Sequence, residues 1–447
     1  MEDIKRSYSF EKGHNFYTND GQSYTVTGYL GRGGQGEAYR VLGREGEFAI
    51  KWYHRGFLSR INADEFYRLL SVNVENGVPR LSNGYEAEQF IWPLKMVRPE
   101  ADSFGYLMKI FPAGYEPFSN IIMMRKRDSD SGQITPLRWK SWFTEITAAL
   151  NITDAFEILH KKGLSYQDLN AGAISINMEN GNVLICDCDN VSPDGSNYGI
   201  KGTLDYMAPE VLCGKAKPDR HTDEYSLAVI LFRLFLHGHP MHGIESTRIH
   251  NSEQISQQDA ELMIYGSQPH YVLAPGNNPN PPDPQRNRDV YILRNQLPPV
   301  LLKAFQQVFT EGVTDSRKRL TATEWRKVLL KMRDNLVLVD GREQFYNPAR
   351  TEDFPADCRM LVYPNDRKVL CTPGKILYKY HLSEHGTDFT TPVGKIIPTK
   401  IPNVIGLYNA TGYPIRYGEN HICPDQGKMP LTAGMVLEIN NLQIKVQ

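Results

Sequence analysis

The stretch of sequence that decides the fold reads LHKKGLSYQDLN and occupies residues 159–170. Upstream of it, residues 139–161 carry apolar side chains at the spacing of one long helix. Gly163 is placed to end that helix, because glycine adopts the left-handed conformation of a helix C-terminus without strain. A short strand then brings Asp168 to the start of a loop. We therefore expect a helix–strand–loop unit that presents one carboxylate.

Three later stretches follow in a defined order. The run VLICDCD at residues 183–189 is an apolar strand that ends in two acids, GTLDYMAPE covers residues 202–210, and TDEYSLA at residues 222–228 opens a hydrophobic helix. Taken singly, Asp168 is compatible with a helix cap and Asp187 with a turn. The order and spacing of all four stretches favour one shared catalytic arrangement over four unrelated ones.

A glycine-rich segment, GRGGQG at residues 31–36, lies between two predicted strands at residues 24–30 and 37–42. Many tight hairpins contain such glycines, so the segment alone is compatible with a simple turn. A dinucleotide-binding fold would place a helix after the glycines, whereas here a strand follows. The segment is therefore predicted to be a flap whose backbone N–H groups bind phosphates. Its pattern glycines are Gly31, Gly33 and Gly36.

Fifteen residues after Gly36, the apolar run FAIK ends in Lys51. A lysine in this place can simply protect an exposed strand edge. After a glycine-rich hairpin it is also placed to neutralise phosphates and to pair with a helix glutamate. We expect that partner to be Glu65, near the start of a helix predicted over residues 62–76. Glu75 is the alternative, and a solvated glutamate is compatible with either position.

These stretches together resemble the eukaryotic-type protein kinase family over roughly residues 24–338. The resemblance implies an α+β, bilobal protein-kinase-like fold with a β-rich N-lobe and a helical C-lobe. It also implies ATP and Mg²⁺ as cofactors and phosphoryl transfer to a protein serine or threonine hydroxyl. In that family's terms, Asp168 orients the acceptor hydroxyl and accepts its proton, Lys51 contacts phosphates, and Asp187 holds Mg²⁺.

The same resemblance implies where adenine would bind. In the run YLMKIFP at residues 106–112, Met108 takes the gatekeeper position. The backbone of Lys109 and Phe111 would contact the adenine ring. These residues complete the expected nucleotide site.

Several structural pairs are also expected. The resemblance implies that Glu210, which closes the activation segment, pairs with Arg319. It implies that Asp223 accepts hydrogen bonds from the backbone of the catalytic loop. Independently of the family, Thr321 and Glu324 have the spacing of a capping box that starts a helix.

More narrowly, the runs SYQDLN (165–170), ICDCDNV (185–191) and SLAVILF (226–232) resemble a bacterial subgroup of these kinases. Members are encoded beside a von Willebrand-type protein and a metal-dependent phosphatase in tellurite-resistance-linked phosphorylation triads. The resemblance implies a protein substrate, with those two proteins as candidate partners. Neither a nucleic-acid partner nor a membrane partner is expected.

The catalytic loop departs from the kinase pattern at Gln167, which precedes Asp168. The family has an arginine there, which grips a phosphorylated loop residue through two parallel hydrogen bonds. Glutamine cannot make that contact, so we expect activity without loop phosphorylation. Four hydroxyl side chains of the activation segment, residues 187–210, are then interpreted as ordinary loop residues rather than modification sites; they are Ser192, Ser196, Tyr198 and Thr203.

A second departure bears on catalysis itself. Ala173 stands five residues after Asp168, where the family has an asparagine whose amide oxygen holds a second Mg²⁺. Alanine has no ligand atom, and one such contact is worth roughly 3 kcal/mol in the barrier. Three functions stay open: a serine/threonine kinase weakened at Ala173, a nucleotide-binding pseudokinase that acts as scaffold or switch, and an interaction protein with a decayed site. The alanine is compatible with a natural residue and with a substituted one.

The chain beyond the kinase-like region has a different character. Residues 358–447 form short strand-like runs separated by Gly, Pro and Asn turns, which predict a small β-sandwich. Its last strands faintly resemble forkhead-associated domains, but the Gly-Arg, Ser and His set that reads phosphothreonine is not recognisable. We expect a protein-docking domain. The predicted domains are an N-lobe at 1–112, a C-lobe at 113–338 and the β-sandwich-like domain at 339–447.

Composition excludes several other classes of protein. The 447 residues include 50 Lys and Arg against 51 Asp and Glu, and a net charge of −1 provides no general attraction to nucleic acid or anionic lipid. Six cysteines are too few for a disulfide scaffold. The first residues, MEDIKRSYSF, contain no apolar signal core. The most apolar run, residues 226–236, is too short to span a bilayer and contains Arg233. These features predict a cytoplasmic protein.

Overall fold

The computed structural model describes residues 9–80, 84, 86–128, 131–197, 199–200, 202–339, 341–346 and 358–447. Taken over the described residues, the chain divides into two compact units. The first comprises Met1–Arg138, Thr147–Ile292 and Phe305–Trp325, and the second comprises Trp139–Ile146, Leu293–Ala304 and Arg326–Gln447. All the site residues predicted from the sequence belong to the first unit.

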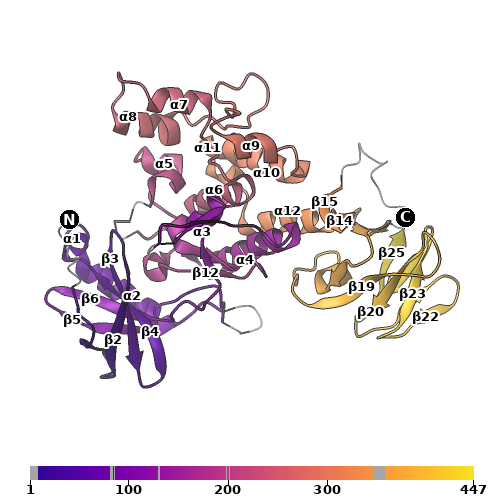
Figure 1. The fold of residues 1–447 in the computed structure, drawn as a ribbon, viewed down its shortest axis with the longest axis horizontal. Helices are drawn as coiled ribbons and strands as arrows, with labels where there is room; N and C mark the ends of the chain where they lie inside the picture. Colours follow the sequence, from indigo (N-terminus) through magenta and orange to yellow (C-terminus); the bar gives the residue numbers. More distant parts are fainter. Residues whose placement is uncertain are drawn as a thin grey trace. The chain divides into compact units, whose positions relative to one another are not determined.

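The first unit begins with an antiparallel sheet in the order β1-β2-β3-β4-β6-β5. Helix α2, Ala63–Asn76, packs against it (Figure 1), because Phe66 and Leu70 share an apolar cluster with Tyr53 and Tyr106 of the sheet. The side chain of Asn62 caps the helix by accepting a hydrogen bond from the Glu65 backbone. The strands are β1 Asn15–Tyr17, β2 Ser23–Arg32, β3 Gly36–Gly43, β4 Gly46–Tyr53, β5 Lys95–Glu100 and β6 Ser103–Met108.

Helices dominate the chain between β6 and β14. The long predicted helix is α4, Trp142–Lys161. Helix α6, Arg220–Leu236, is buried along nearly its whole length, and its run from Leu227 to Phe232 is apolar on every side. Within the described residues, no helix is both long and apolar enough for a bilayer span. The other helices are α1 Arg55–Leu58, α3 Phe118–Ile122, α5 Pro209–Leu212, α7 Ile244–His250, α8 Gln257–Leu262, α9 Arg288–Leu293, α10 Pro299–Phe309, α11 Glu311–Thr314 and α12 Ala322–Asp334.

Short strands hold the loops that carry the catalytic candidates. β10 pairs with β13, and β11 pairs with both β12 and β7, so the chain on either side of Asp168 and Asp187 is fixed by backbone hydrogen bonds. A hairpin of β8 and β9 lies outside this arrangement. The strands are β7 Glu116–Pro117, β8 Arg125–Arg127, β9 Ile134–Pro136, β10 Leu164–Ser165, β11 Ile174–Ile176, β12 Val183–Ile185 and β13 Ser192–Pro193.

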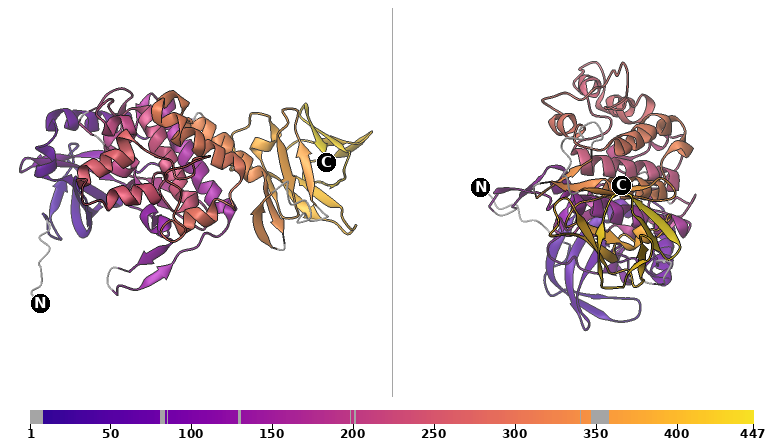
Figure 2. Two further views of the ribbon diagram at one scale, coloured as in Figure 1. Left: turned by 90° about the horizontal axis from the view of Figure 1, so that it is seen from above. Right: turned by 90° about the vertical axis from the view of Figure 1, so that its right-hand side faces the viewer.

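The second unit carries the C-terminal strands, which Figure 2 shows as layered sheets. One sheet has the order β17-β16-β25-β24-β21-β22 and the other the order β18-β19-β20-β23. Both contribute to one apolar core, for example Ile444 from the first sheet and Ile396 from the second. The hairpin β14–β15, Leu336–Val339 and Arg342–Phe345, also lies in this unit. The sandwich strands are β16 Arg359–Val362, β17 Lys368–Cys371, β18 Ile376–Tyr378, β19 Pro392–Pro398, β20 Ile405–Asn409, β21 Ile415–Tyr417, β22 His421–Cys423, β23 Lys428–Leu431, β24 Val436–Ile439 and β25 Leu442–Val446.

Two strands differ from the sequence patterns. The sequence predicts a strand over Ile91–Val97, but β5 begins only at Lys95, since Pro93 lacks a backbone N–H for a ladder hydrogen bond. The run ILYKYHL predicts a strand throughout, but β18 ends at Tyr378 and a 3-10 turn follows. The side chain of His381 accepts a hydrogen bond of 2.8 Å from the Tyr378 backbone and turns the chain at that point.

Candidate active site

A cavity of about 700 Å³ lies in the first unit between the glycine-rich hairpin and the loops after β10 and β12. Ala49 and Lys51 of β4 line the cavity, and residues 109–111, which follow β6, line it as well. A cavity of this size is sufficient for a nucleotide-sized ligand. Nearly all the predicted site residues line it, namely Gly31, Gly33, Gly36, Lys51, Met108, Lys109, Phe111, Asp168 and Asp187.

The glycines of the hairpin serve two different purposes. A Cβ built on Gly36 would lie 2.2 Å from the backbone oxygen of Trp52, so glycine is required there by the close approach of β3 and β4. A Cβ on Gly31 or Gly33 would meet no atom within 4 Å. Packing therefore does not require glycine at those two positions, and the open space beside their backbone faces the cavity.

Lys51 points from β4 to the acids after β12. Its ammonium donates hydrogen bonds to the Asp187 carboxylate at 3.0 Å, to Asp189 at 2.8 Å and to the side-chain oxygen of Gln35 at 2.9 Å. Burial lowers the pKa of Lys51, but the charges of Asp187 and Asp189 outweigh burial and hold that pKa above its ordinary value. The lysine is therefore a permanent cation at the cavity wall.

The predicted partner of Lys51 is not the one observed. Glu65 is exposed, and its carboxylate accepts a hydrogen bond from the Asn62 side chain at 3.0 Å instead of contacting Lys51. Glu75, the alternative, is also exposed. The physical reason is the orientation of α2, whose apolar residues face the sheet and leave its acids on the solvent side.

Asp168 lies at the cavity and is held by two neighbours. The Thr203 hydroxyl donates a hydrogen bond of 2.8 Å to its Oδ1, and the Asn170 amide donates one of 3.2 Å to the same atom. Burial raises the pKa of the Asp168 carboxyl above its ordinary value, although these two hydrogen bonds oppose the rise. Such a carboxylate is positioned to accept a proton from a hydroxyl placed in the cavity.

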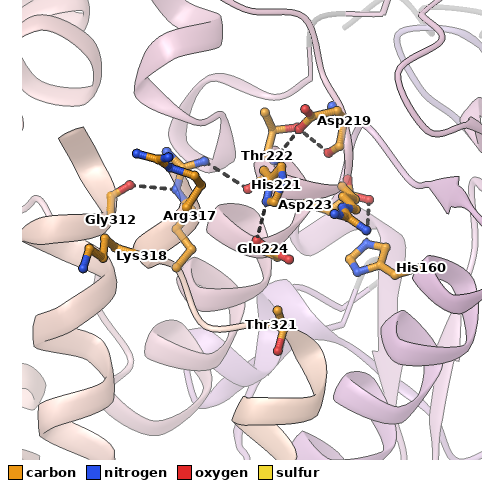
Figure 3. A network of polar contacts seen from close by, with 12 residues as sticks. His160, Asp219, His221, Thr222, Asp223, Glu224, Gly312, Arg317, Lys318 and Thr321 are labelled. Carbon is orange, nitrogen blue, oxygen red and sulfur yellow. Dashed lines mark hydrogen bonds and ion pairs between the residues drawn. The ribbon is translucent and has the colours of Figure 1, made fainter. Parts of the chain in front are cut away.

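The loop that carries Asp168 is anchored from below by Asp223 of α6. Its carboxylate accepts hydrogen bonds from the backbone of Tyr166 at 2.6 Å and of Gln167 at 2.8 Å, as predicted. His160 contacts the same carboxylate at 3.1 Å, and Figure 3 shows this pair beside the capped start of α6. The Tyr166 hydroxyl donates to the Cys186 carbonyl, which ties the loop of Asp168 to the segment before Asp187.

Asp187 adopts a left-handed conformation with φ of 53°, and its half-exposed side chain faces the cavity. Carboxylate oxygen is the ligand that Mg²⁺ prefers, so Asp187 fits one position of such an ion. Ala173 is fully buried and offers no ligand atom at the second position. Asp187 therefore fits one ligand position of such an ion, and Ala173 fits none.

Four residues that were not predicted from the sequence lie at or beside this site. Gln35 and Asp189 contact Lys51, and the Tyr53 hydroxyl donates a hydrogen bond to Asp189. Asn190 lines the cavity, and within the described part of the chain its buried amide has no hydrogen-bond partner. The one available signal in the sequence was Asp189 itself, the second acid at the end of the apolar run VLICDCD.

The chain is similar to several curated protein kinases. Serine/threonine-protein kinase sck2 of Schizosaccharomyces pombe is 30% identical over 133 residues, which cover 29% of this chain and 18% of the relative. Serine/threonine-protein kinase YPK3 of Saccharomyces cerevisiae is 31% identical over 134 residues, covering 27% and 25%. Protein kinase C delta type of Mus musculus is 30% identical over 128 residues, covering 26% and 19%. The matched part thus spans at most 25% of the length of these relatives.

A family model described as protein kinase domain matches residues 24–326. That span contains the glycine-rich hairpin, Lys51, Asp168 and Asp187, and it ends within α12. Because the match covers more than half of the 447 residues, this chain belongs to the protein kinase domain family.

Proposed function

We propose that this chain is an ATP- and Mg²⁺-dependent serine/threonine protein kinase. The observation that carries the proposal is the convergence of Lys51, Asp168 and Asp187 on one cavity beneath the glycine-rich hairpin. Protein kinase family membership and serine/threonine kinase relatives support it. The proposed arrangement is two-lobed, with an N-lobe at 1–112, a C-lobe at 113–338 and a β-sandwich-like domain at 339–447.

Each residue then has a physical role. The backbone of Gly31 and Gly33 has room to approach phosphates, and the Lys51 ammonium neutralises their charge. Met108 and the backbone of Lys109 and Phe111 contact adenine. Bound ATP and Mg²⁺ supply the transferable phosphoryl group and the charge that stabilises its transfer.

Asp168 and Asp187 have different roles in the proposed transfer. Asp187 holds the cation through its carboxylate, and Asp168 orients the acceptor hydroxyl and accepts its proton. The Thr203 hydroxyl keeps the Asp168 carboxylate in place at 2.8 Å. The Ala173 side chain supplies no cation ligand, so we propose that transfer is slower than in a kinase with asparagine there.

The proposal is tested by following phosphate from γ-labelled ATP to the chain itself and to a generic basic protein. Asp168→Asn is the matched control, because it preserves the size of the side chain and removes the proton acceptor. We expect transfer by the unaltered chain to exceed that by Asp168→Asn by at least about a hundredfold. Equal transfer by both chains would refute the kinase activity.

A second candidate is a nucleotide-binding pseudokinase that acts as a scaffold or switch. The observation that favours it is Ala173, which is fully buried and has no side-chain atom that could bind a cation. Thermal unfolding with and without ATP and Mg²⁺ separates the two functions. Stabilisation by nucleotide without measurable transfer supports the pseudokinase.

For the partners, we propose a protein substrate in the cytoplasm, with a von Willebrand-type protein and a metal-dependent phosphatase of a tellurite-resistance-linked triad as candidates. We also propose that the C-terminal domain, with its two-sheet core, is a degenerate forkhead-associated-like docking module. Asn409, the last residue of β20, donates hydrogen bonds from its amide to loop carbonyls such as those of Tyr413 and Pro424, which supports a structural role there. Incubating the chain with each purified candidate and ATP, and assaying phosphorylation, tests the substrate assignment.

A further inference from the structure

Asp189 is a completely buried acid behind the nucleotide cavity. Its side chain is 0% exposed, and its Oδ2 accepts hydrogen bonds from the Lys51 ammonium at 2.8 Å and from the Tyr53 hydroxyl. Within the described residues, its Oδ1 has no hydrogen-bond partner. A buried carboxylate is costly unless a cation compensates it, so Asp189 and Lys51 depend on each other.

Helix α2 supplies no acid to Lys51. Its acidic residues are Asp64, Glu65 and Glu75, and all three are exposed. The face that it turns to β4 is apolar, with Phe66 in contact with the Tyr53 ring at a centroid distance of 5.2 Å. An acid on that face of α2 would have to replace one of these core side chains.

Asp187 does not fill the same role, although it also contacts Lys51. It lines the cavity and is 45% exposed, which leaves it available to a cation there. Asp189 does not line the cavity. Of the two acids, only Asp189 is placed to stay with Lys51 when the cavity is filled.

We infer that Asp189 is the positioning residue for Lys51 and takes the place of a helix glutamate in this kinase. The inference rests on the proposed function, since it assigns Lys51 to the phosphates of ATP. Lys51 lies in strand β4 and Asp189 lies in the segment after β12, so the lysine is held without a movement of α2. The Tyr53 hydroxyl orients the Asp189 carboxylate toward the ammonium.

The test is a double-mutant cycle on nucleotide affinity, which does not require turnover. The dissociation constant of the non-hydrolysable analogue AMP-PNP with Mg²⁺ is measured by calorimetry for the full chain and for Asp189→Asn, Lys51→Met and the double variant. We expect Asp189→Asn to weaken binding about tenfold or more, because it removes a charged hydrogen bond to Lys51. In the Lys51→Met background the same substitution should change affinity less than about twofold.

Tyr53→Phe provides a milder variant if Asp189→Asn does not fold. It keeps the ring and removes one hydrogen bond to Asp189, so we expect a Lys51-dependent loss of about two- to fivefold. Tyr106→Phe is the matched control, since Tyr106 is a buried tyrosine of the same cluster whose hydroxyl has no partner among the described residues. Its affinity should equal that of the unaltered chain.

The outcomes separate this inference from the proposed function. If the unaltered chain does not bind AMP-PNP and Mg²⁺, the proposed nucleotide site is wrong. If it binds, and Glu65→Gln or Glu75→Gln weakens binding through Lys51 while Asp189→Asn and Tyr53→Phe do not, the assignment of Asp189 is overturned.

Discussion

The Arg319 guanidinium donates two parallel hydrogen bonds of 2.7 Å to the Glu210 carboxylate. The Arg319 side chain is fully buried, and its remaining groups bind the carbonyls of Gly312 and His221. The pairing predicted from the sequence is therefore confirmed. It joins the end of the activation segment to the turn before α12, and buried pairs of this bidentate kind are strongly coupled.

Arg319→Ala should destabilise the first unit, because it leaves the Glu210 carboxylate without its buried partner. We expect a loss of about 3–5 kcal/mol in the free energy of unfolding, measured by urea denaturation. Arg317→Ala is the control. Arg317 pairs with Asp315 on the surface and is 84% exposed, so its removal should cost at most about 0.5 kcal/mol. Equal losses for the two variants would contradict the role of Arg319.

Ala173→Asn should raise the rate of phosphate transfer. It adds an amide oxygen at the position where the kinase pattern has its second cation ligand, and a single electrostatic contact of this kind is worth about two to three orders of magnitude in kcat. The measurement is kcat at saturating ATP and Mg²⁺. Ala171→Asn, two residues earlier in the same 3-10 turn, is the off-register control. An unchanged kcat in a folded Ala173→Asn variant would show that the missing ligand does not limit turnover.

Gln167 should hold the activation segment without a phosphate. Its amide donates hydrogen bonds to the Ser165 hydroxyl and the Ser196 carbonyl, while the Asn197 amide donates to its oxygen at 3.0 Å. Gln167→Ala removes this neutral network and should lower kcat about tenfold. Asn197→Ala, which deletes one of these bonds, should have a smaller effect.

The same network predicts the response to phosphatase. Treating the active chain with phosphatase should leave kcat unchanged, because the neutral Gln167 side chain cannot form an ion pair with a phosphorylated loop residue. Loss of activity after treatment, together with a mapped phosphate on Ser192, Ser196 or Thr203, would contradict this prediction. Tyr198, the fourth hydroxyl of the segment, lies outside the described residues.

The second unit should lose stability in mild acid through His381. Burial lowers the pKa of its imidazole from 6.5 to about 4, although the nearby charge of Asp334 opposes the change. The unfolded chain therefore binds a proton more readily between pH 6.5 and 4, so stability falls as the pH falls through that range. The expected slope is at most about 1.4 kcal/mol per pH unit.

His381→Gln removes that proton and should flatten the pH dependence of unfolding in this range. His385→Gln is the control, because His385 is exposed in the same segment. The measurement is urea unfolding of the full chain between pH 4 and 7, followed for the transition that His381→Gln affects. A slope that survives His381→Gln would assign the acid sensitivity elsewhere.

Local patterns predicted much of the first unit. The helix over residues 62–76 is found as α2, and the strand that ends in Lys51 is found as β4, because each pattern reflects one element burying one face. The capping box is confirmed as well, with hydrogen bonds between Thr321 and Glu324 in both directions. Such interactions join residues a few positions apart, so the sequence specifies them directly.

The partner of Lys51 could not be predicted in this way. Lys51 and Asp189 are 138 positions apart, and their contact depends on how β4, β12 and α2 pack together. The same packing decided that Glu65 faces solvent and that Asn190 lies at the cavity. Charge alone could not distinguish these positions, because an acid at a helix start and an acid after a strand look equally available in sequence.

The sequence by itself determined the protein kinase family, the order of the elements and the identity of Lys51, Asp168 and Asp187 as the residues of the cavity, since motif spacing and periodicity are properties of neighbouring residues. Only the tertiary structure decided which acid holds Lys51. Burial made that decision: Asp189 is enclosed with the lysine and must be compensated by it, whereas Glu65 remains in water and needs no partner.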